Sequence, residues 1–206
     1  MCANIYVEFM RILIACEYSG TVRDAFIRAG HDAMSCDLLD TDTPGPHYMG
    51  DIRDVLDREW DMMVAHPPCT YLASMGIWWN KKRPERWPLT YAARDFVNLL
   101  FNAPIDKICI ENPIGYLSNN WRKWNQIVHP WQFGDEASKP TCLWLKNLPL
   151  LKPTNIVGKG EFYVKSNGAR MAKWSHITSG TNKSKRAKIA STTFKGIADA
   201  MASQWS

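Results

Sequence analysis

Short apolar runs alternate with stretches of helical spacing through the first half of the chain. The runs have the length of buried strands, and they lie at residues 11–16, 33–36, 60–65 and 107–110. Helices are predicted at residues 22–28, directly after residue 52 and at residues 89–102. This alternation favours an α/β fold with a mostly parallel sheet and helices on both faces.

The pattern is less regular after residue 119. A further apolar run covers residues 141–145, and residues 194–205 predict a closing amphipathic helix. Ten tryptophans are spread along the 206 residues. Their rings serve either core packing or the stacking of a base or cofactor, and the sequence leaves both open.

Composition limits the class of protein. The length suits one hydrophobic core with at most a small appendage, and 46% hydrophobic with 22% charged residues argues against a disordered or fibrous protein. No apolar run approaches the roughly 20 residues of a membrane span, and the first residues lack a secretory signal pattern. We therefore expect a protein of the cytoplasm, with no membrane partner.

Positive charge is concentrated near the end of the chain. Residues 152–188 contain nine lysines and arginines against one acid, Glu161, so this segment carries +8 and the rest of the chain −3. Such a segment is either a solvated surface or a contact for a phosphate backbone. The tyrosine, tryptophan and glycines interleaved with the charges favour contact with nucleic acid.

The cysteines draw attention to one loop. Six are present without a CxxC pair, which argues against a zinc site and against a disulfide framework, so we expect no metal and mostly buried thiols. Cys69 is different because it follows a predicted strand in the sequence His66-Pro67-Pro68-Cys69. The prolines fix the backbone there, and a thiol so held is a candidate nucleophile once a proton acceptor or positive charge is near.

A second polar cluster, Glu111-Asn112-Pro113, follows the next predicted strand. Ligands of parallel sheets bind at the carboxyl ends of the strands, so Glu111 is expected to face the same cleft as Cys69. Burial in a dry pocket would raise the pKa of Glu111, so that it carries a proton for a pyrimidine ring nitrogen. An exposed strand-end glutamate is the alternative.

The loops after the first strands suit an adenosine-type ligand. Ser19-Gly20 allows close backbone approach, and the following helix N-terminus favours a carboxylate of the ligand. Asp37 is placed to bind ribose hydroxyls, and Asp51 to accept from an adenine amino group. Either aspartate alone is equally explained as a helix cap or a solvated loop residue.

These motifs, in this order, resemble the cytosine-C5 DNA methyltransferases. The resemblance rests on Ser19-Gly20, Asp37, Gly50-Asp51-Ile52, Pro67-Pro68-Cys69 and Glu111-Asn112-Pro113, and it covers about residues 11–115 and, more weakly, 191–205. It implies a Rossmann-like fold of the type that binds S-adenosylmethionine, and methyl transfer to C5 of a cytosine in DNA that is flipped out or single-stranded. The reduced size also resembles stand-alone methylases of bacterial viruses, which implies the cytoplasm of a bacterial host.

The resemblance assigns residues to three sets. The catalytic set is Cys69, Glu111 and Lys139. The set for S-adenosylmethionine is Cys16, Glu17, Tyr18, Ser19, Gly20, Asp37, Leu38, Asp51, Ile52 and Pro67. The set for the nucleic acid is Pro68, Thr70, Asn112, Pro113, Trp78, Lys81, Lys82, Arg83 and Arg186.

The chain departs from the family in two places. The Gln-x-Arg-x-Arg element is missing, and Lys139 is the candidate to replace one of its arginines. The target-recognition region shrinks to residues 146–188, between a catalytic domain at 1–145 and a terminal helix at 189–206 that is expected to pack back on it. Methylation of a tRNA cytosine, transfer of a group other than methyl, and a non-catalytic donor- or DNA-binding relic stay open as alternatives.

Overall fold

The computed structural model describes residues 9–164, 166, 168–172 and 193–206. Its centre is a seven-stranded sheet in the order β3-β2-β1-β4-β5-β7-β6. The strands are β1 Arg11–Ala15, β2 Asp32–Asp37, β3 His47–Met49, β4 Met62–Ala65, β5 Lys107–Pro113, β6 Gln126–Val128 and β7 Thr141–Lys146. Strands β1 to β5 pair in parallel, whereas β7 is antiparallel to both β5 and β6. The predicted Rossmann-like, mostly parallel α/β sheet is confirmed.

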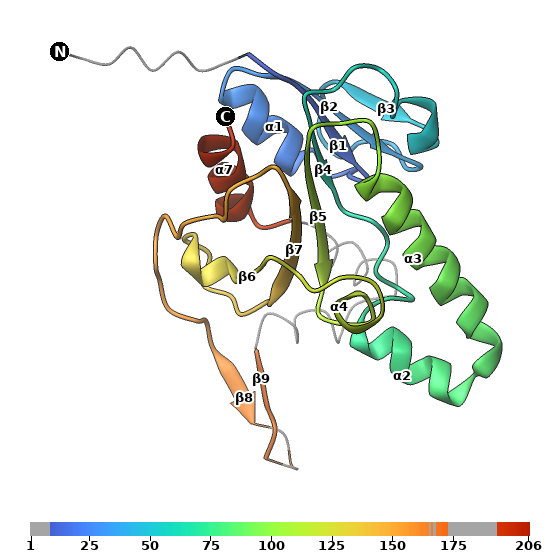
Figure 1. Cartoon of the computed structure of the whole chain (residues 1–206). Helices are drawn as coiled ribbons and strands as arrows, with labels where there is room; N and C mark the ends of the chain where they lie inside the picture. The colour runs from blue at the N-terminus through green and yellow to red at the C-terminus, as the bar shows by residue number, and fades with distance from the viewer. Residues whose placement is uncertain (1–8, 165, 167, 173–192) are drawn as a thin grey trace.

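Helices cover both faces of this sheet (Figure 1). Helices α1 (Thr21–Arg28) and α7 (Lys195–Gln204) pack together over one face, and α3 (Trp87–Phe101) covers the other. Strand β1 shows why its apolar run is continuous. Ile12 and Ile14 belong to the core beneath α1 and α7, and Leu13 and Ala15 to the core beneath α3, since successive side chains of a strand point to opposite faces.

The remaining elements are short, and the sequence pattern did not predict most of them. They are η1 Ile52–Asp54, α2 Ser74–Lys82, η2 Pro84–Arg86, α4 Leu117–Asn120, η3 Pro130–Gln132, β8 Phe162–Val164 and β9 Arg170–Ala172. Strands β8 and β9 form an antiparallel ribbon that extends away from the body of the molecule (Figure 1). It lies within the basic segment, whose residues 173–188 fall outside the described residues.

One predicted boundary is wrong in an informative way. The strand at 107–110 was expected to end before Glu111, but β5 continues to Pro113. Its pairing with β4 ends at Ile110, opposite Ala65, while β7 goes on pairing with it through Pro113. Along its last three residues, the edge of β5 that faces β4 therefore lies next to the loop that begins at His66 and not next to a strand.

The tryptophans differ in burial, and core packing is confirmed for some of them while the stacking role stays a prediction. Trp144 is fully buried and its ring packs against Trp121, and Trp60 donates from Nε1 to the carbonyl of Val55. Trp78 and Trp79 instead lie exposed on α2. The five cysteines in the described part are free thiols, three of them buried. Among the described helices, none is long and apolar enough to cross a membrane.

The closing helix is present as α7, with Trp205 donating from its indole to the carbonyl of Pro149. The division into domains at 1–145, 146–188 and 189–206 stays a prediction.

Candidate active site

The loop His66-Pro67-Pro68-Cys69 and the end of β5 border one cavity. The cavity has a volume of about 460 Å³ and is lined by residues of three segments, 66–69, 111–114 and 139–140, together with Ser74. Cys69, Glu111 and Lys139, the three residues expected to be catalytic, all lie on its wall. The shared cleft that the two strand ends predicted is therefore present, and the roles of its residues stay predictions.

Glu111 is held by partners from three sides. Its Oε2 lies 3.2 Å from Nδ1 of His66, and both side chains are largely buried, at 15% and 7% exposure. Burial raises the pKa of Glu111, but the hydrogen bond and charge of His66, the charge of Lys139 and a hydrogen bond from Thr141 outweigh it, so the pKa lies below the usual range. The expected raised pKa is wrong for this state of the protein: Glu111 is ionised at neutral pH.

Cys69 has the opposite shift. Burial and the negative charge of Glu111 raise the pKa of its thiol, and the positive charge of Lys139 acts against them. The thiol consequently keeps its proton at neutral pH in the free protein. A reaction at sulfur then needs a proton acceptor, and Glu111 is an ionised carboxylate on the same cavity.

Asn112 connects the two sides of the cavity. It is buried, and its Nδ2 donates to the carbonyl oxygen of Pro67 at 2.8 Å. Its Oδ1 is buried without a hydrogen-bond partner in the described part of the chain, and so is Nε2 of His66. Two unsatisfied polar atoms on one cavity are typical of a site that completes its hydrogen bonds with a ligand.

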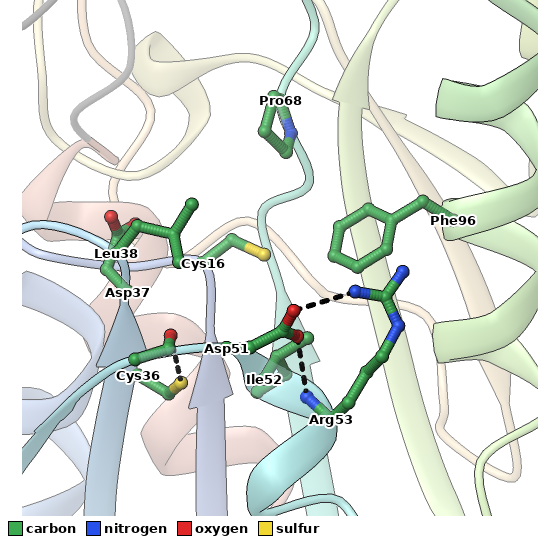
Figure 2. A pocket seen from close by; sticks show the side chains of 10 residues that line it. Cys16, Cys36, Asp37, Leu38, Asp51, Ile52, Arg53, Pro68 and Phe96 are labelled. Carbon is green, nitrogen blue, oxygen red and sulfur yellow. Dashed lines mark hydrogen bonds and ion pairs between the residues drawn. The ribbon is translucent and has the colours of Figure 1, made fainter.

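A second pocket lies beside the first, at the carboxyl ends of β1 and β2. Its lining consists of Cys16, Cys36, Asp37, Leu38, Gly50, Asp51, Ile52, Arg53, Pro68 and Phe96. Figure 2 shows Asp37 and Leu38 on one side, Phe96 of α3 on the other, and Pro68 above them. Pro68 lines both cavities, so a ligand in one borders a ligand in the other.

Two carboxylates stand on the wall of this second pocket. Asp37 accepts from the backbone N–H of Leu39, and Asp51 accepts from the backbone N–H and from Nη1 of Arg53. The hydrogen bond from the Arg53 backbone, with its side chain and charge, lowers the pKa of Asp51. The guanidinium of Arg53 lies 5.6 Å from the centre of the Phe96 ring.

The chemistry of this pocket fits an adenosine-type ligand with a positive charge. Leu38, Ile52 and Phe96 offer apolar walls for a base, and the two aspartates offer acceptors for hydroxyl and amino groups. Asp51 is paired with Arg53, and Asp37 adds a second carboxylate, so acids exceed bases in the lining, which disfavours phosphate groups. The residues present therefore fit S-adenosylmethionine better than a nucleotide.

The first loop serves a different purpose from the one expected. The buried carboxylate of Glu17 accepts from the N–H groups of Val22 and Arg23, at 2.8 and 3.3 Å, and from the hydroxyl of Ser19. The chain's own glutamate thus occupies the start of α1, where a ligand carboxylate was expected. Gly20 has a positive φ of 74° and approaches Arg23 and Thr43 rather than the pocket.

The predicted residues therefore separate into groups. With Cys69 lie Pro67, Pro68, Asn112 and Pro113, and the second pocket brings together Cys16, Asp37, Leu38, Asp51 and Ile52. Pro67 borders the first cavity and is absent from the lining of the second. Glu17, Tyr18, Ser19 and Gly20 form the turn into α1 and do not line the second pocket, Thr70 is exposed in the loop, and Arg186 lies outside the described residues.

Sequence reasoning missed several lining residues. Phe96, Cys36 and Arg53 line the second pocket, and His66, Ser74, Ile114 and Pro140 the first. His66 had a visible signal, because it stands directly before the two prolines. Phe96 had none, since its place on the pocket depends on how α3 packs across the sheet.

Helix α2, whose first residue lines the first cavity, carries exposed aromatic and basic side chains. Trp78 and Trp79 are 49% and 42% exposed and touch edge to face, with ring centres 4.9 Å apart. The Lys82 ammonium lies over the Trp78 ring and the Arg83 guanidinium over the Trp79 ring. Ser74 at the start of α2 lines both the first cavity and a hollow beside Trp78.

Neither a protein-family model nor a curated protein sequence matches the chain. Among solved structures, a protein assigned as a DNA modification methyltransferase of an E. coli prophage aligns at 13% identity and a TM-score of 0.49, over 72% of this chain and 52% of its own. The S. pombe Dnmt2 methyltransferase aligns at 15% and 0.45, over 83% and 59%. A mutant of Spodoptera frugiperda DNMT2 aligns at 15% and 0.41, over 72% and 54%.

The chain thus spans just over half the length of these structures. Likeness this distant carries no conclusion about activity, and we derive function from the chain's own site.

Proposed function

We propose that this protein is a DNA cytosine-C5 methyltransferase that uses S-adenosylmethionine as the methyl donor. One observation carries the proposal: a thiol and a carboxylate, Cys69 and Glu111, line a single cavity that borders, through Pro68, a pocket suited to an adenosine-type cation. Attack on a cytosine ring requires a nucleophile for C6 and an acid for N3 within one site, next to the donor.

The ionised state of Glu111 determines how the proposed reaction begins. Glu111 accepts the proton of the Cys69 thiol, which converts the thiol to a thiolate and the carboxylate to an acid. The sulfur then bonds to C6 of the cytosine while Glu111 gives its proton to N3. The electron pair of the C5–C6 double bond then forms a C4–C5 double bond as N3 takes the proton, and C5 becomes the nucleophilic carbon of an enamine.

Asp37, Asp51 and the apolar walls around them would hold the donor, which would supply an electrophilic methyl group. After C5 has gained the methyl group, its proton passes to water and the S–C6 bond breaks with the electron pair on sulfur. Glu111 takes back the proton from N3 and returns it to the thiolate, which restores the aromatic ring, the carboxylate and the thiol. Lys139 lies on the same cavity wall, where its positive charge stabilises the thiolate.

The proposed substrate is a cytosine outside a base-paired stack. The ring faces must be reached by sulfur and by the donor, and removing a base from duplex DNA costs a few kcal/mol. The exposed Trp78 and Trp79 offer aromatic faces for stacking, and Lys81, Lys82 and Arg83 offer charges for phosphates. This face of α2 adjoins the cavity at Ser74.

The test is methyl transfer by the purified protein. DNA and RNA are incubated separately with isotopically labelled S-adenosylmethionine, and their nucleosides are analysed by mass spectrometry. The proposal expects labelled 5-methylcytosine from DNA, and none from Cys69→Ala or Glu111→Gln, while both variants still bind the donor by calorimetry. Full methylation by Cys69→Ala would rule out the nucleophile.

The other outcomes decide between the alternatives. Label found in RNA alone identifies an RNA methyltransferase with the same ring chemistry. Donor binding without label in either nucleic acid identifies a non-catalytic relic. Steep loss of DNA affinity with salt, reduced in a Lys81→Ala, Lys82→Ala double variant, supports phosphate contact by α2, and affinity that salt does not change rejects it.

A further inference from the structure

His66 lies beside Glu111 on the wall of the first cavity. It is the first residue after β4, and Nδ1 lies 3.2 Å from Oε2 of Glu111 and 3.5 Å from the hydroxyl of Thr193. A carboxylate only accepts hydrogen bonds, so Nδ1 carries the proton in the contact with Glu111. This contact fixes one oxygen of Glu111 on the wall of the cavity.

The second ring nitrogen makes the position costly for stability. Nε2 of His66 is buried, and within the described residues it has no hydrogen-bond partner. A buried polar nitrogen without a partner lowers stability, and an apolar side chain at this position would avoid that loss. A structural histidine elsewhere in this chain differs: His31 is buried with both nitrogens in contact, Nδ1 with the N–H of Met10 and Nε2 with the hydroxyl of Ser206.

We propose that His66 is a positioning residue for Glu111: its Nδ1–H holds one oxygen of the carboxylate and so orients Glu111 to take the thiol proton of Cys69. The inference rests on the proposed function for its catalytic consequence, although the His66–Glu111 contact itself does not. His66 does not touch the reacting atoms. Because of His66, Glu111 stays ionised, and so able to accept a proton, at a lower pH than burial alone would allow.

The other groups around Glu111 do not replace His66. Lys139 adds positive charge from the loop before β7, and Thr141 of β7 donates a hydrogen bond, but His66 is the largest of the influences that keep Glu111 ionised. The thiols of Cys69, Cys109 and Cys142 also lie within the electrostatic reach of Glu111, and its negative charge raises the pKa of each. Without His66, burial would still raise the pKa of Glu111, and only Lys139 and Thr141 would lower it.

The decisive variant is His66→Asn, which keeps a neutral amide donor near the position of Nδ1 and removes the imidazole. We expect the carboxyl carbon of Glu111, followed by NMR in the free protein with labelled glutamate and assigned with Glu111→Gln, to titrate at higher pH than in the wild type. His66→Gln serves as a second variant if His66→Asn fails to fold. His31→Asn is the matched control and leaves the Glu111 titration where it is.

Activity gives the second readout. The pH profile of kcat/KM reports the ionisations of the free enzyme, so its acid limb moves to higher pH in His66→Asn and stays in place in His31→Asn. His66→Ala, which removes the donor as well, loses about tenfold or more in single-turnover rate.

A Glu111 titration that is the same in the wild type, His66→Asn and His66→Gln overturns the inference, whatever the activity. A titration that moves in a protein without methyl transfer supports the His66–Glu111 pair and refutes the proposed function alone.

Discussion

The side-chain amide of Asn112 donates to the carbonyl oxygen of Pro67 at 2.8 Å, directly beside the contact between Glu111 and His66. Two successive residues at the end of β5 therefore hold two successive residues of the loop after β4. Adjacent side chains of a strand point to opposite faces, so the loop is fixed from both sides of β5. Cys69, two residues further on, is held in addition by the following turn, where its carbonyl accepts from the N–H groups of Leu72 and Ala73.

Asn112→Asp tests this arrangement with almost no change in shape. The substitution replaces the donor with an oxygen that faces the Pro67 carbonyl inside a buried site. We expect a loss of about 2 kcal/mol or more in unfolding free energy, measured by urea denaturation, and a fall in the rate of label transfer. Asn120→Asp is the control, because Asn120 makes the same kind of bond, to the carbonyl of Tyr116 at 2.9 Å, on an exposed helix. Its expected cost is below about 0.5 kcal/mol, and equal costs for the two variants would contradict the role of Asn112.

Gly20 and Gly30 offer a matched pair at the two ends of α1. Both have positive φ, 74° and 97°, so alanine costs roughly 1 kcal/mol in backbone strain at either position. At Gly20 the added Cβ would lie 2.5 Å from Nη2 of Arg23, a fully buried side chain that binds the loop after β2, whereas at Gly30 nothing lies within 4 Å. We therefore expect Gly20→Ala to cost about 1–3 kcal/mol more than Gly30→Ala in chemical denaturation. Similar denaturation midpoints for the two variants would show that the turn into α1 accommodates the added methyl group with little strain.

The sequence predicted the sheet and the shared cleft because both depend on local patterns. Apolar runs of strand length fixed four parallel strands, and the motifs at their ends placed Cys69 and Glu111 at one edge. The sequence did not predict that the pKa of Glu111 is lowered, because His66 and Lys139 reach that carboxylate from separate segments of the chain. It also missed Phe96, whose surroundings come from the packing of α3. The role of Glu17 was misjudged because a carboxylate near a helix start serves the helix and a ligand equally well.

Asp37→Ala tests the donor pocket. Asp37 lines the pocket at the end of β2, and a charged hydrogen bond to a ligand hydroxyl is worth about 1.5–3 kcal/mol. We expect S-adenosylmethionine to bind about tenfold or more weakly by calorimetry. Asp40→Ala is the control on the same loop: the Asp40 carboxylate likewise accepts a backbone N–H, that of Thr41, but does not line the pocket. Unchanged affinity in Asp37→Ala would remove this aspartate from the donor site.

The acid stability of the protein reports the charge state of Glu111 without any substrate. Its pKa in the folded chain lies below the ordinary value of 4.5, so the ionised form favours folding. This contribution is complete above that ordinary value and is lost as the pH falls through the lower folded pKa. We therefore expect the wild type to exceed Glu111→Gln in unfolding free energy by a margin that is constant near neutral pH and shrinks between about pH 5 and pH 3, measured by urea denaturation. In a His66→Ala background the same Glu111→Gln substitution should give a smaller margin, because the largest influence that keeps the carboxylate ionised has been removed. A margin that grows as the pH falls would mean that Glu111 is protonated in the folded protein, and the proton transfer from Cys69 to Glu111 would then have to be abandoned.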